Sequence, residues 1–251
     1  MSGHSKWSQI KRQKGVADVR RGAVFTKVAR EISLAARQGG GDPDANFRLR
    51  LALQKAKENN MPSDNVDRAI KRGVGGAEVA HLLEYNLEGY GSNGVAMLVE
   101  IVTDNKQRTL QEVRNVFTRH GGNLGDSGSV AWLFENKGII NVEANAKEAD
   151  DVSLAAIDAG ADDVKTLEGS VEVYTSPESM EKVRRALEEK KYKVTSAEVS
   201  LWPKTTVELD EKGAISNLKL VEKLEDLDDV QKVHSNLEFS EELAEKLVAK
   251  V

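Results

Sequence analysis

Residues 138–201 read GIINVEANAKEADDVSLAAIDAGADDVKTLEGSVEVYTSPESMEKVRRALEEKKYKVTSAEVSL, and their pattern decides the fold. Short apolar runs alternate with stretches of helical period, and Gly160 and Gly169 stand at two of the joins. The expected elements are a strand at 138–143, a helix at 147–159, hairpin strands at 163–168 and 170–175, a helix at 177–190 capped by Ser176, and a strand at 193–201. This βαββαβ order is the ferredoxin-like pattern, which predicts an antiparallel sheet with its helices on one face.

The segments on both sides of this stretch predict a second α/β domain. The elements expected before it are strands at 82–91 and 94–104, a helix at 106–120 and a strand at 130–135. The elements expected after it are a strand at 205–209, a helix at 215–227, a strand at 230–239 and a closing helix at 240–251. We therefore predict a discontinuous middle domain at 81–136 and 204–251, with the ferredoxin-like domain at 137–203 inserted into it.

Residues 1–80 predict a basic helical domain with a linker. Apolar residues recur at helical spacing in 18–38, and a glycine triplet follows. A second helix is expected to begin near Asp42 and Pro43, with Asp42 as its cap, and a third is expected at 63–72, closed by Gly73. The predicted fold class is α+β: an N-terminal three-helix domain followed by two ferredoxin-like α/β domains, the last inserted into the middle one.

Charge is distributed unevenly along the chain. The first 80 residues hold 16 Lys and Arg against 8 Asp and Glu, a net charge of +8, so the remainder carries −13 of the chain's total of −5. Such asymmetry points to a polyanionic partner. The densest basic stretch, residues 3–32, is expected to contact nucleic acid, with the acidic body as its carrier.

Several classes of protein are disfavoured. The chain has no cysteine, which excludes disulfides, thiolate metal sites and cysteine nucleophiles. No apolar run approaches the roughly 20 residues that a membrane span needs, and the N-terminus lacks an apolar signal segment. We expect a cytoplasmic protein with no membrane partner.

Two groups of cations are candidates for phosphate contacts. The first surrounds Trp7, whose indole could stack on an exposed base; the alternative is a solubilising arm with Trp7 docked on a helix. The second lies on one face of the helix at 18–38, where the alternative is an ordinary solvated face. The cations of the two groups are Lys6, Lys11, Arg12 and Lys14, then Arg20, Lys27, Arg30 and Arg37.

The remaining motifs are interpreted as structural. The GxGxxG match at 89–94 leads into a strand rather than a helix, so we interpret it as a turn. The glycine-rich stretch 120–129 is interpreted as a loop, with contact to phosphate or a ribosomal surface as the alternative. The four histidines are dispersed, and no metal, catalytic site or cofactor is predicted. The acidic run at 222–229 is interpreted as a solvated helix end, with a divalent-metal cluster as the alternative.

The sequence resembles the YebC family of bacterial and organellar regulators. The matching stretches are GHSKWSQIKRQK, RRGAVFTKVAREI, GGGDPDANFRLRLAL, KAKENNMPSDNVDRAIKRG, EGYGSNGVAMLVEIVTDNKQRT, RHGGNLGDSGSVAWLFENKG and PKTTVEL, which follow family order over nearly the whole chain. The resemblance implies three domains and no known catalytic activity. It also places Arg21 in the family's basic segment, so the predicted nucleic-acid-binding residues are Lys6, Trp7, Lys11, Arg12, Lys14, Arg20, Arg21, Lys27, Arg30 and Arg37.

The resemblance implies a function in gene expression. Family members are described as DNA-binding transcriptional regulators, and relatives act as translational activators or at the ribosome. The first prediction is therefore a non-enzymatic, DNA-binding transcriptional regulator. The alternative is a translation factor that binds the ribosome, ribosomal RNA or transfer RNA. The most distant alternative is an uncharacterised enzyme.

Overall fold

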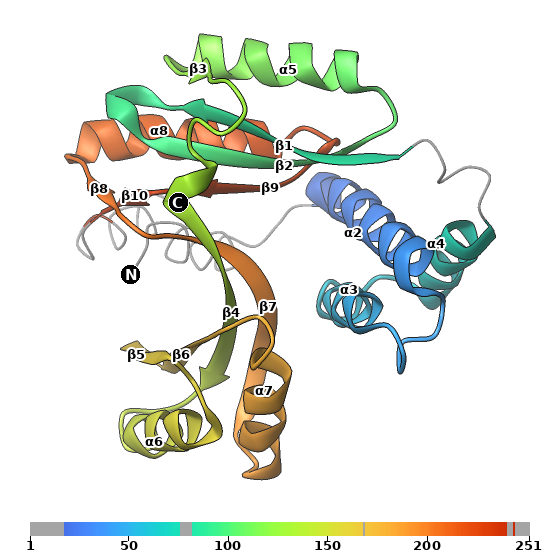
Figure 1. Ribbon diagram of the computed structural model, residues 1–251, viewed down its shortest axis with the longest axis vertical. Coiled ribbons are helices and arrows are strands. Elements are labelled where there is room, and N and C mark those ends of the chain that lie inside the picture. Colours follow the sequence, from blue (N-terminus) through green and yellow to red (C-terminus); the bar gives the residue numbers. More distant parts are fainter. Residues whose placement is uncertain (1–17, 76–81, 168, 240–242, 244–251) are drawn as a thin grey trace. The chain divides into compact units, whose positions relative to one another are not determined.

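The computed structural model describes residues 18–75, 82–167, 169–239 and 243, without the side chains of residues 18–21 (Figure 1). The chain forms two compact units: Met1–Leu133 with Pro203–Val251, and Phe134–Trp202. The first unit holds helices and a four-stranded antiparallel sheet, and the second holds another four-stranded antiparallel sheet with two helices. The predicted α+β class, with a helical N-terminal region followed by α/β parts, is confirmed. The exact division into three domains stays a prediction.

The helical region of the first unit consists of α2 (Asp18–Gly39), α3 (Phe47–Glu58) and α4 (Ser63–Gly75). Its core is built from the apolar faces of the three helices, including the fully buried Ile32 and Leu49. The apolar spacing that predicted α2 is confirmed, because residues one turn apart on a helix lie on the same face.

Two predicted helix ends in this region are wrong. The second helix begins at Phe47 rather than near Asp42, because residues 43–45 form a turn and Asn46 is the cap that accepts a hydrogen bond from the Leu49 amide at 3.0 Å. Gly73 does not close α4, which continues to Gly75. Gly73 is instead a buried contact point, where an added Cβ would lie 2.4 Å from the Ser33 carbonyl oxygen of α2.

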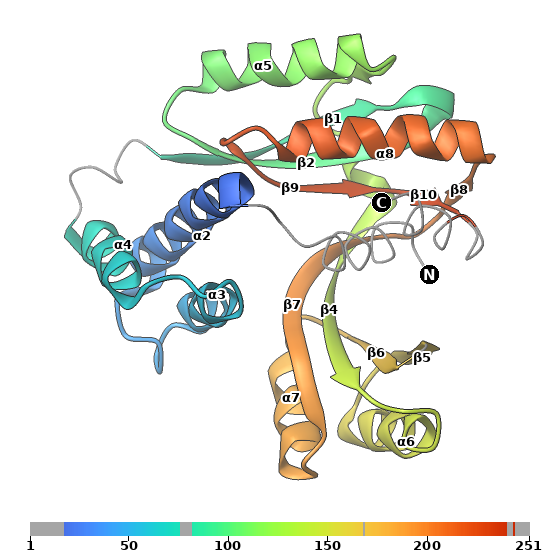
Figure 2. The same ribbon diagram turned by 180° about the vertical axis from the view of Figure 1, so that it is seen from behind.

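The antiparallel sheet of the first unit has the strand order β3-β1-β2-β9. Its long central pair is β1 (Leu83–Tyr90) and β2 (Ala96–Thr103), and its outer strands are β9 (Val230–Ser235) and the short β3 (Asn123–Leu124). The β1–β2 register runs from Leu83 opposite Thr103 to Tyr90 opposite Ala96. One sheet face packs against α5 (Lys106–Arg119) and α8 (Glu211–Glu225), which bury Phe117 and Leu220 in the shared core (Figure 2).

Three elements of this unit differ from the sequence prediction. Residues 131–133 form the 3₁₀ turn η3 (Ala131–Leu133) rather than the start of a strand at 130, and the edge strand of the sheet is β3. The strand expected at 205–209 is the short β8 (Val207–Glu208), which pairs in parallel with β10 (Leu237–Glu238) outside the main sheet. The strand expected at 230–239 is therefore divided between β9 and β10. The helix predicted at 240–251 lies outside the described residues, apart from Leu243.

The second unit has the predicted ferredoxin-like topology. Its strand order is β5-β6-β4-β7, with antiparallel β4–β6 and β5–β6 pairs. Gly160 ends its first helix with φ +107° and Gly169 turns the hairpin with φ +78°, as expected of residues in the left-handed region. Both helices begin two to three residues later than predicted. The elements are β4 (Phe134–Glu143), α6 (Ala149–Ala159), β5 (Asp163–Leu167), β6 (Ser170–Thr175), α7 (Met180–Glu189) and β7 (Lys193–Pro203).

Candidate nucleic-acid interface

The predicted nucleic-acid-binding residues fall into three groups. Lys6, Trp7, Lys11, Arg12 and Lys14 lie outside the described residues. Arg20 and Arg21 lie in α2, where only their backbone is described. The side chains of Lys27, Arg30 and Arg37 are described, and all three belong to α2.

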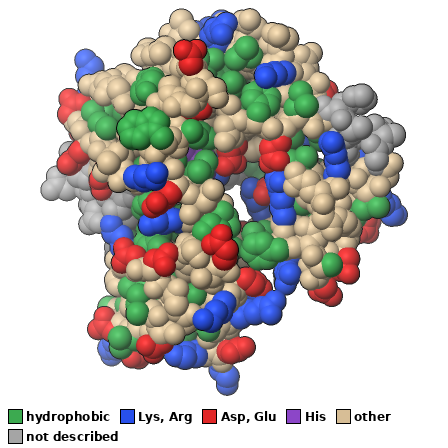
Figure 3. Space-filling view, viewed as in Figure 1, with side chains coloured by type: hydrophobic (Ala, Val, Ile, Leu, Met, Phe, Trp, Pro, Cys, Tyr) green, Lys and Arg blue, Asp and Glu red, His purple; other side chains and the backbone are tan. Residues whose placement is uncertain are grey.

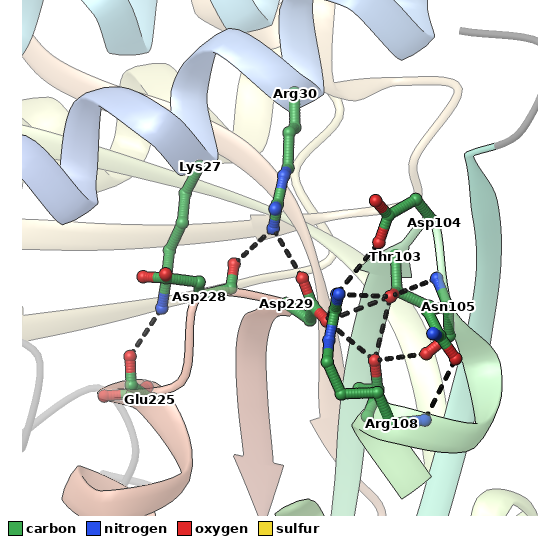
Figure 4. A network of polar contacts seen from close by, with 10 residues as sticks. Lys27, Arg30, Thr103, Asp104, Asn105, Arg108, Glu225, Asp228 and Asp229 are labelled. Atoms are coloured by element: carbon green, nitrogen blue, oxygen red, sulfur yellow. Dashed lines mark hydrogen bonds and ion pairs between the residues drawn. The ribbon is translucent and has the colours of Figure 1, made fainter. Parts of the chain in front are cut away.

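Lys27 donates to the last residue of α8, and Arg30 donates to the segment that joins α8 to β9 (Figure 4). Their spacing of three residues places them on one face of α2. Lys27 Nζ donates to the Glu225 carbonyl oxygen. Arg30 Nη1 donates to the Asp228 carbonyl oxygen at 2.6 Å and to Asp229 Oδ1 at 2.9 Å. The cationic face of α2 therefore contacts an oxygen-rich segment of the same unit.

Asp229 is the centre of this network. Its side chain is only 3% exposed, and each of its oxygens accepts at least one hydrogen bond. Oδ1 accepts from Arg30, while Oδ2 accepts from the guanidinium of Arg108 and from two hydroxyl groups at 2.7–2.9 Å. A buried carboxylate is tolerated when cations and hydrogen-bond donors surround it in this way. Its four side-chain partners are Arg30, Thr103, Arg108 and Thr109.

The network changes the acidity of Asp229 and Arg108. Burial alone raises the pKa of Asp229, but hydrogen bonds from Arg108, Thr109 and Thr103, with the charge of Arg30, outweigh burial and lower the pKa below its usual range. Arg108 also pairs with Asp104 at 2.9 Å, and its hydrogen bonds to the two carboxylates raise its pKa. Both groups are therefore charged at neutral pH.

The C-terminal end of α2 makes a second set of contacts with the start of β1. Arg37 donates to the Leu82 carbonyl oxygen at 3.4 Å, and Gln38 donates to Glu84 at 3.5 Å. Glu84 also forms an ion pair with Arg48 of α3. The described cations of α2 thus bind acceptors of their own unit at both ends of the helix.

The internal contacts of the α2 cations determine how these cations can bind a phosphate. On the face drawn in Figure 3, Lys and Arg side chains are interspersed with Asp and Glu side chains. Lys27 and Arg30 bind carbonyl and carboxylate oxygens, which are the same kind of acceptor as the oxygens of a phosphate. A phosphate that takes over these donors must therefore displace the internal acceptors.

The glycine-rich stretch 120–129 is held by a buried carboxylate. Glu88 accepts from the backbone amides of Gly128, Val130 and Ala131 at 2.6–2.8 Å. Burial alone raises the pKa of Glu88, but these three amides outweigh burial and lower it. The side chain of Trp132, which follows this loop, is 66% exposed.

The GxGxxG match is a turn, as its position before a strand indicated. Residues 92–94 form a 3₁₀ turn between β1 and β2, and Asn217 of α8 donates to both oxygens of Ser92 at 3.0–3.1 Å. Within the described residues, no group of three or more His, Asp or Glu side chains is placed to hold a metal ion. No described helix is long and apolar enough to span a membrane.

Comparison with known families accounts for both units. The family model for the TACO1/YebC protein N-terminal domain matches residues 5–76, and the model for the TACO1/YebC second and third domain matches residues 82–237. The chain belongs to the TACO1/YebC family.

Relatives across the TACO1/YebC family match nearly the whole chain. A "probable transcriptional regulatory protein" of Dehalococcoides mccartyi strain CBDB1 is 54% identical and covers 98% of each chain. A protein of the same description from Herpetosiphon aurantiacus is 53% identical, again with 98% of each chain covered. The crystal structure of a conserved hypothetical protein from Aquifex aeolicus matches with a TM-score of 0.81 at 44% identity, covering 89% of this chain and 93% of that one.

In this TACO1/YebC chain, the sequence did not predict that residues 225, 228 and 229 accept hydrogen bonds from the cations of α2. The interpretation of the acidic run as a solvated helix end is wrong for Asp229, which is buried, while Asp226 and Asp228 are exposed. The one local indication was that Asp229 directly precedes a predicted strand, which begins with Val230. Its partners Thr103 and Arg108 lie more than 100 residues away, where no spacing rule reaches.

Proposed function

We propose that this chain is a non-enzymatic regulator of gene expression that binds nucleic acid through its basic helical region, with DNA-level control of transcription as the first candidate. The observation that carries the proposal is the charge asymmetry: a net of +8 in residues 1–80 against −13 in the rest. Counterion release from phosphates favours binding at the basic region, and the acidic body is repelled. The names of the relatives, probable transcriptional regulatory proteins, support the same function.

Phosphate contacts are assigned to the predicted set from Lys6 to Arg37, with a stacking contact at Trp7. For Lys27 and Arg30, phosphate oxygens replace the acceptors at residues 225, 228 and 229 when nucleic acid binds. Contacts of this type fix position without specifying base sequence. We propose that the protein acts in the cytoplasm.

Salt dependence of binding tests the proposal. Fluorescence anisotropy would measure the affinity of the wild type, Lys11→Ala and Arg30→Ala for labelled duplexes at several salt concentrations. Each substitution should weaken binding to every duplex and reduce the salt slope by about 1, because each removes one phosphate contact. Lys147→Ala is the matched control, since Lys147 is an exposed lysine of the other unit. Slopes for Lys11→Ala and Arg30→Ala equal to that of the wild type would refute the assignment.

A ribosome- or RNA-binding translation factor is the second candidate. The exposed side chain of Trp132 favours it, because a flat aromatic surface suits unpaired bases, which RNA presents more often than duplex DNA. Co-sedimentation with ribosomes and binding to promoter fragments would be compared at equal ionic strength. Stable association with ribosomes, without preference among duplexes, would place translation ahead of transcription.

A further inference from the structure

We propose that Trp132 is a stacking site for an unpaired nucleobase, with Lys204 beside it for the adjoining phosphate. The proposal rests on the proposed function and adds a second contact point, outside the basic helical region. It specifies the class of ligand for this point: a single-stranded segment or a flipped-out base.

The exposure of Trp132 requires an explanation. Its side chain is 66% exposed, the largest exposed fraction among the large exposed hydrophobic side chains of the described residues. An indole ring left in water forgoes much of the burial free energy that a tryptophan supplies. Its polar edge is already satisfied, because Nε1 donates to the Ser129 carbonyl oxygen at 3.1 Å. What remains exposed is therefore mainly the apolar surface of the ring.

The backbone around Trp132 is held in place from several sides. Glu88 accepts from the amides of Gly128, Val130 and Ala131, and the Tyr90 hydroxyl donates to the Ser129 carbonyl oxygen at 3.0 Å. Val130 is fully buried. A ring presented on such a fixed turn loses little conformational entropy when a ligand stacks on it, which favours binding.

A cation is bound to the backbone of Trp132. Lys204 Nζ donates to the Trp132 carbonyl oxygen at 3.0 Å, and the Lys204 amide donates to the Leu133 carbonyl oxygen at 2.8 Å. Lys204 is exposed, and its ammonium group has three donors, so it can also meet a phosphate oxygen. An aromatic face with a neighbouring cation is the usual combination for single-stranded nucleic acid.

The chemistry of this site separates it from the basic helical region. Asp126 is also exposed in the preceding loop, so the local charge is close to balanced and stacking supplies most of the affinity. In a duplex, base pairs cover each other's faces, so only an unpaired base can stack on Trp132. We therefore expect selectivity for single strands, and the stacking contact itself should contribute little to the salt slope.

The test measures binding of wild type, Trp132→Ala, Trp132→Phe and Trp132→Leu to labelled 12-nucleotide single-stranded RNA, to DNA of the same sequence, and to the DNA duplex. Trp132→Ala should bind the single strands about 5- to 150-fold more weakly, corresponding to the loss of about 1–3 kcal/mol for one stacked base, with an unchanged salt slope. Trp132→Phe should recover most of the affinity and Trp132→Leu should not. Duplex affinity should stay unchanged. Equal losses with RNA and DNA indicate stacking alone, and a larger loss with RNA adds a 2′-hydroxyl contact.

Failure of the stacking site and failure of the proposed function give different results. If the wild type binds single strands and Trp132→Ala binds them equally well, the stacking site is refuted and the proposed function stands. If Trp132→Leu recovers as much as Trp132→Phe, the contact is a general apolar one, as a protein partner would make, and the stacking site is refuted. If the wild type binds neither single strands nor duplexes, the proposed function itself fails. Urea unfolding should give the same midpoint for all four proteins, because the replaced ring is exposed.

Discussion

At the scale of single residues, Asp229 is the internal ion-pair partner of Arg30, one of the cations of α2. Arg30 and Arg108 come from helices far apart in the sequence, and both donate to this one carboxylate. Arg30 is only 23% exposed, so its ion pair is screened less than a surface pair. The side chain expected to meet phosphate thus also has an internal role.

Asp229→Asn should lower the free energy of unfolding by about 2–3 kcal/mol, because a neutral amide faces Arg30 and its N–H groups oppose the buried hydroxyls of Thr103 and Thr109. Urea unfolding monitored by circular dichroism would measure this change. Asp226→Asn is the matched control: its side chain is 43% exposed and pairs with Lys223 on the surface, so its cost should stay below about 0.5 kcal/mol. Equal effects of the two substitutions would contradict the role of Asp229.

The same carboxylate predicts a dependence on pH. The folded-state pKa of Asp229 is lowered, so its stabilising effect is fully present above the unfolded-state pKa of about 3.9 and is lost as pH falls through the folded-state value. The difference in unfolding free energy between wild type and Asp229→Asn should be constant from pH 8 to about pH 5 and should shrink below about pH 4. Unfolding curves collected across this range would measure it. A difference in unfolding free energy that grows in acid would contradict a lowered pKa of Asp229 in the folded protein.

At the scale of elements, small residues and one asparagine set the packing of the helical region. Gly73 of α4 lies against the Ser33 carbonyl group of α2, and the Ser33 hydroxyl donates to the Ala69 carbonyl oxygen at 2.8 Å. Asn46 caps α3 and also donates to the Ala35 and Gly40 carbonyl oxygens at 2.8 Å. The close approach of α2 and α4 therefore depends on the absence of a side chain at residue 73.

Gly73→Ala should destabilise the protein by about 1–3 kcal/mol, because the added methyl group would lie 2.4 Å from the Ser33 carbonyl oxygen and 2.7 Å from the Ala36 Cβ. Thermal unfolding would measure the loss. Gly75→Ala makes the same chemical change in the same helix. Apart from the adjoining backbone, no atom of the described residues lies within 4 Å of the new Cβ, so the change should be neutral or stabilising by up to about 1 kcal/mol. Equal unfolding temperatures for the two variants would contradict the close contact between α2 and α4 at Gly73.

The elements show which parts of the structure local sequence could predict. Apolar spacing located α2, α5 and the β1–β2 hairpin, because these depend on neighbouring residues. Short elements were predicted poorly: β3 was missed and β8 was expected to be longer, since each has two residues and is formed by pairing with a strand elsewhere in the chain. The candidate interface was predicted on its cationic side only. Arg30 and Asp229 are 199 residues apart, and only the folded chain brings them together.

At the scale of the whole molecule, the second unit is an insertion with adjacent ends. The hydrogen bond between the Lys204 amide and the Leu133 carbonyl group joins the residues on either side of it. Among the described residues, the core around the sheet of the first unit contains none from Phe134–Trp202. We therefore expect the first unit to fold without the second.

Replacing residues 134–202 by a short glycine linker should leave a protein that unfolds in a single cooperative transition, because closing the short gap costs little entropy. Circular dichroism and urea unfolding would test this. As a control, a deletion of equal length that removes residues 96–164, including β2, should abolish cooperative unfolding. A broad, non-cooperative transition of the first variant would show that the second unit is needed for the first to fold.

The insertion also imposes an order on synthesis of the chain. The strand β2 pairs with β9, which leaves the ribosome only after the intervening residues have been made. At about 5–20 residues per second, the edge of β2 waits roughly 7 to 26 s for this partner. The ferredoxin-like segment emerges complete in that interval. Nascent chains of this protein therefore carry an apolar strand with one unpaired edge through about half of their translation, and any pause between residues 103 and 235 lengthens the period during which they can aggregate.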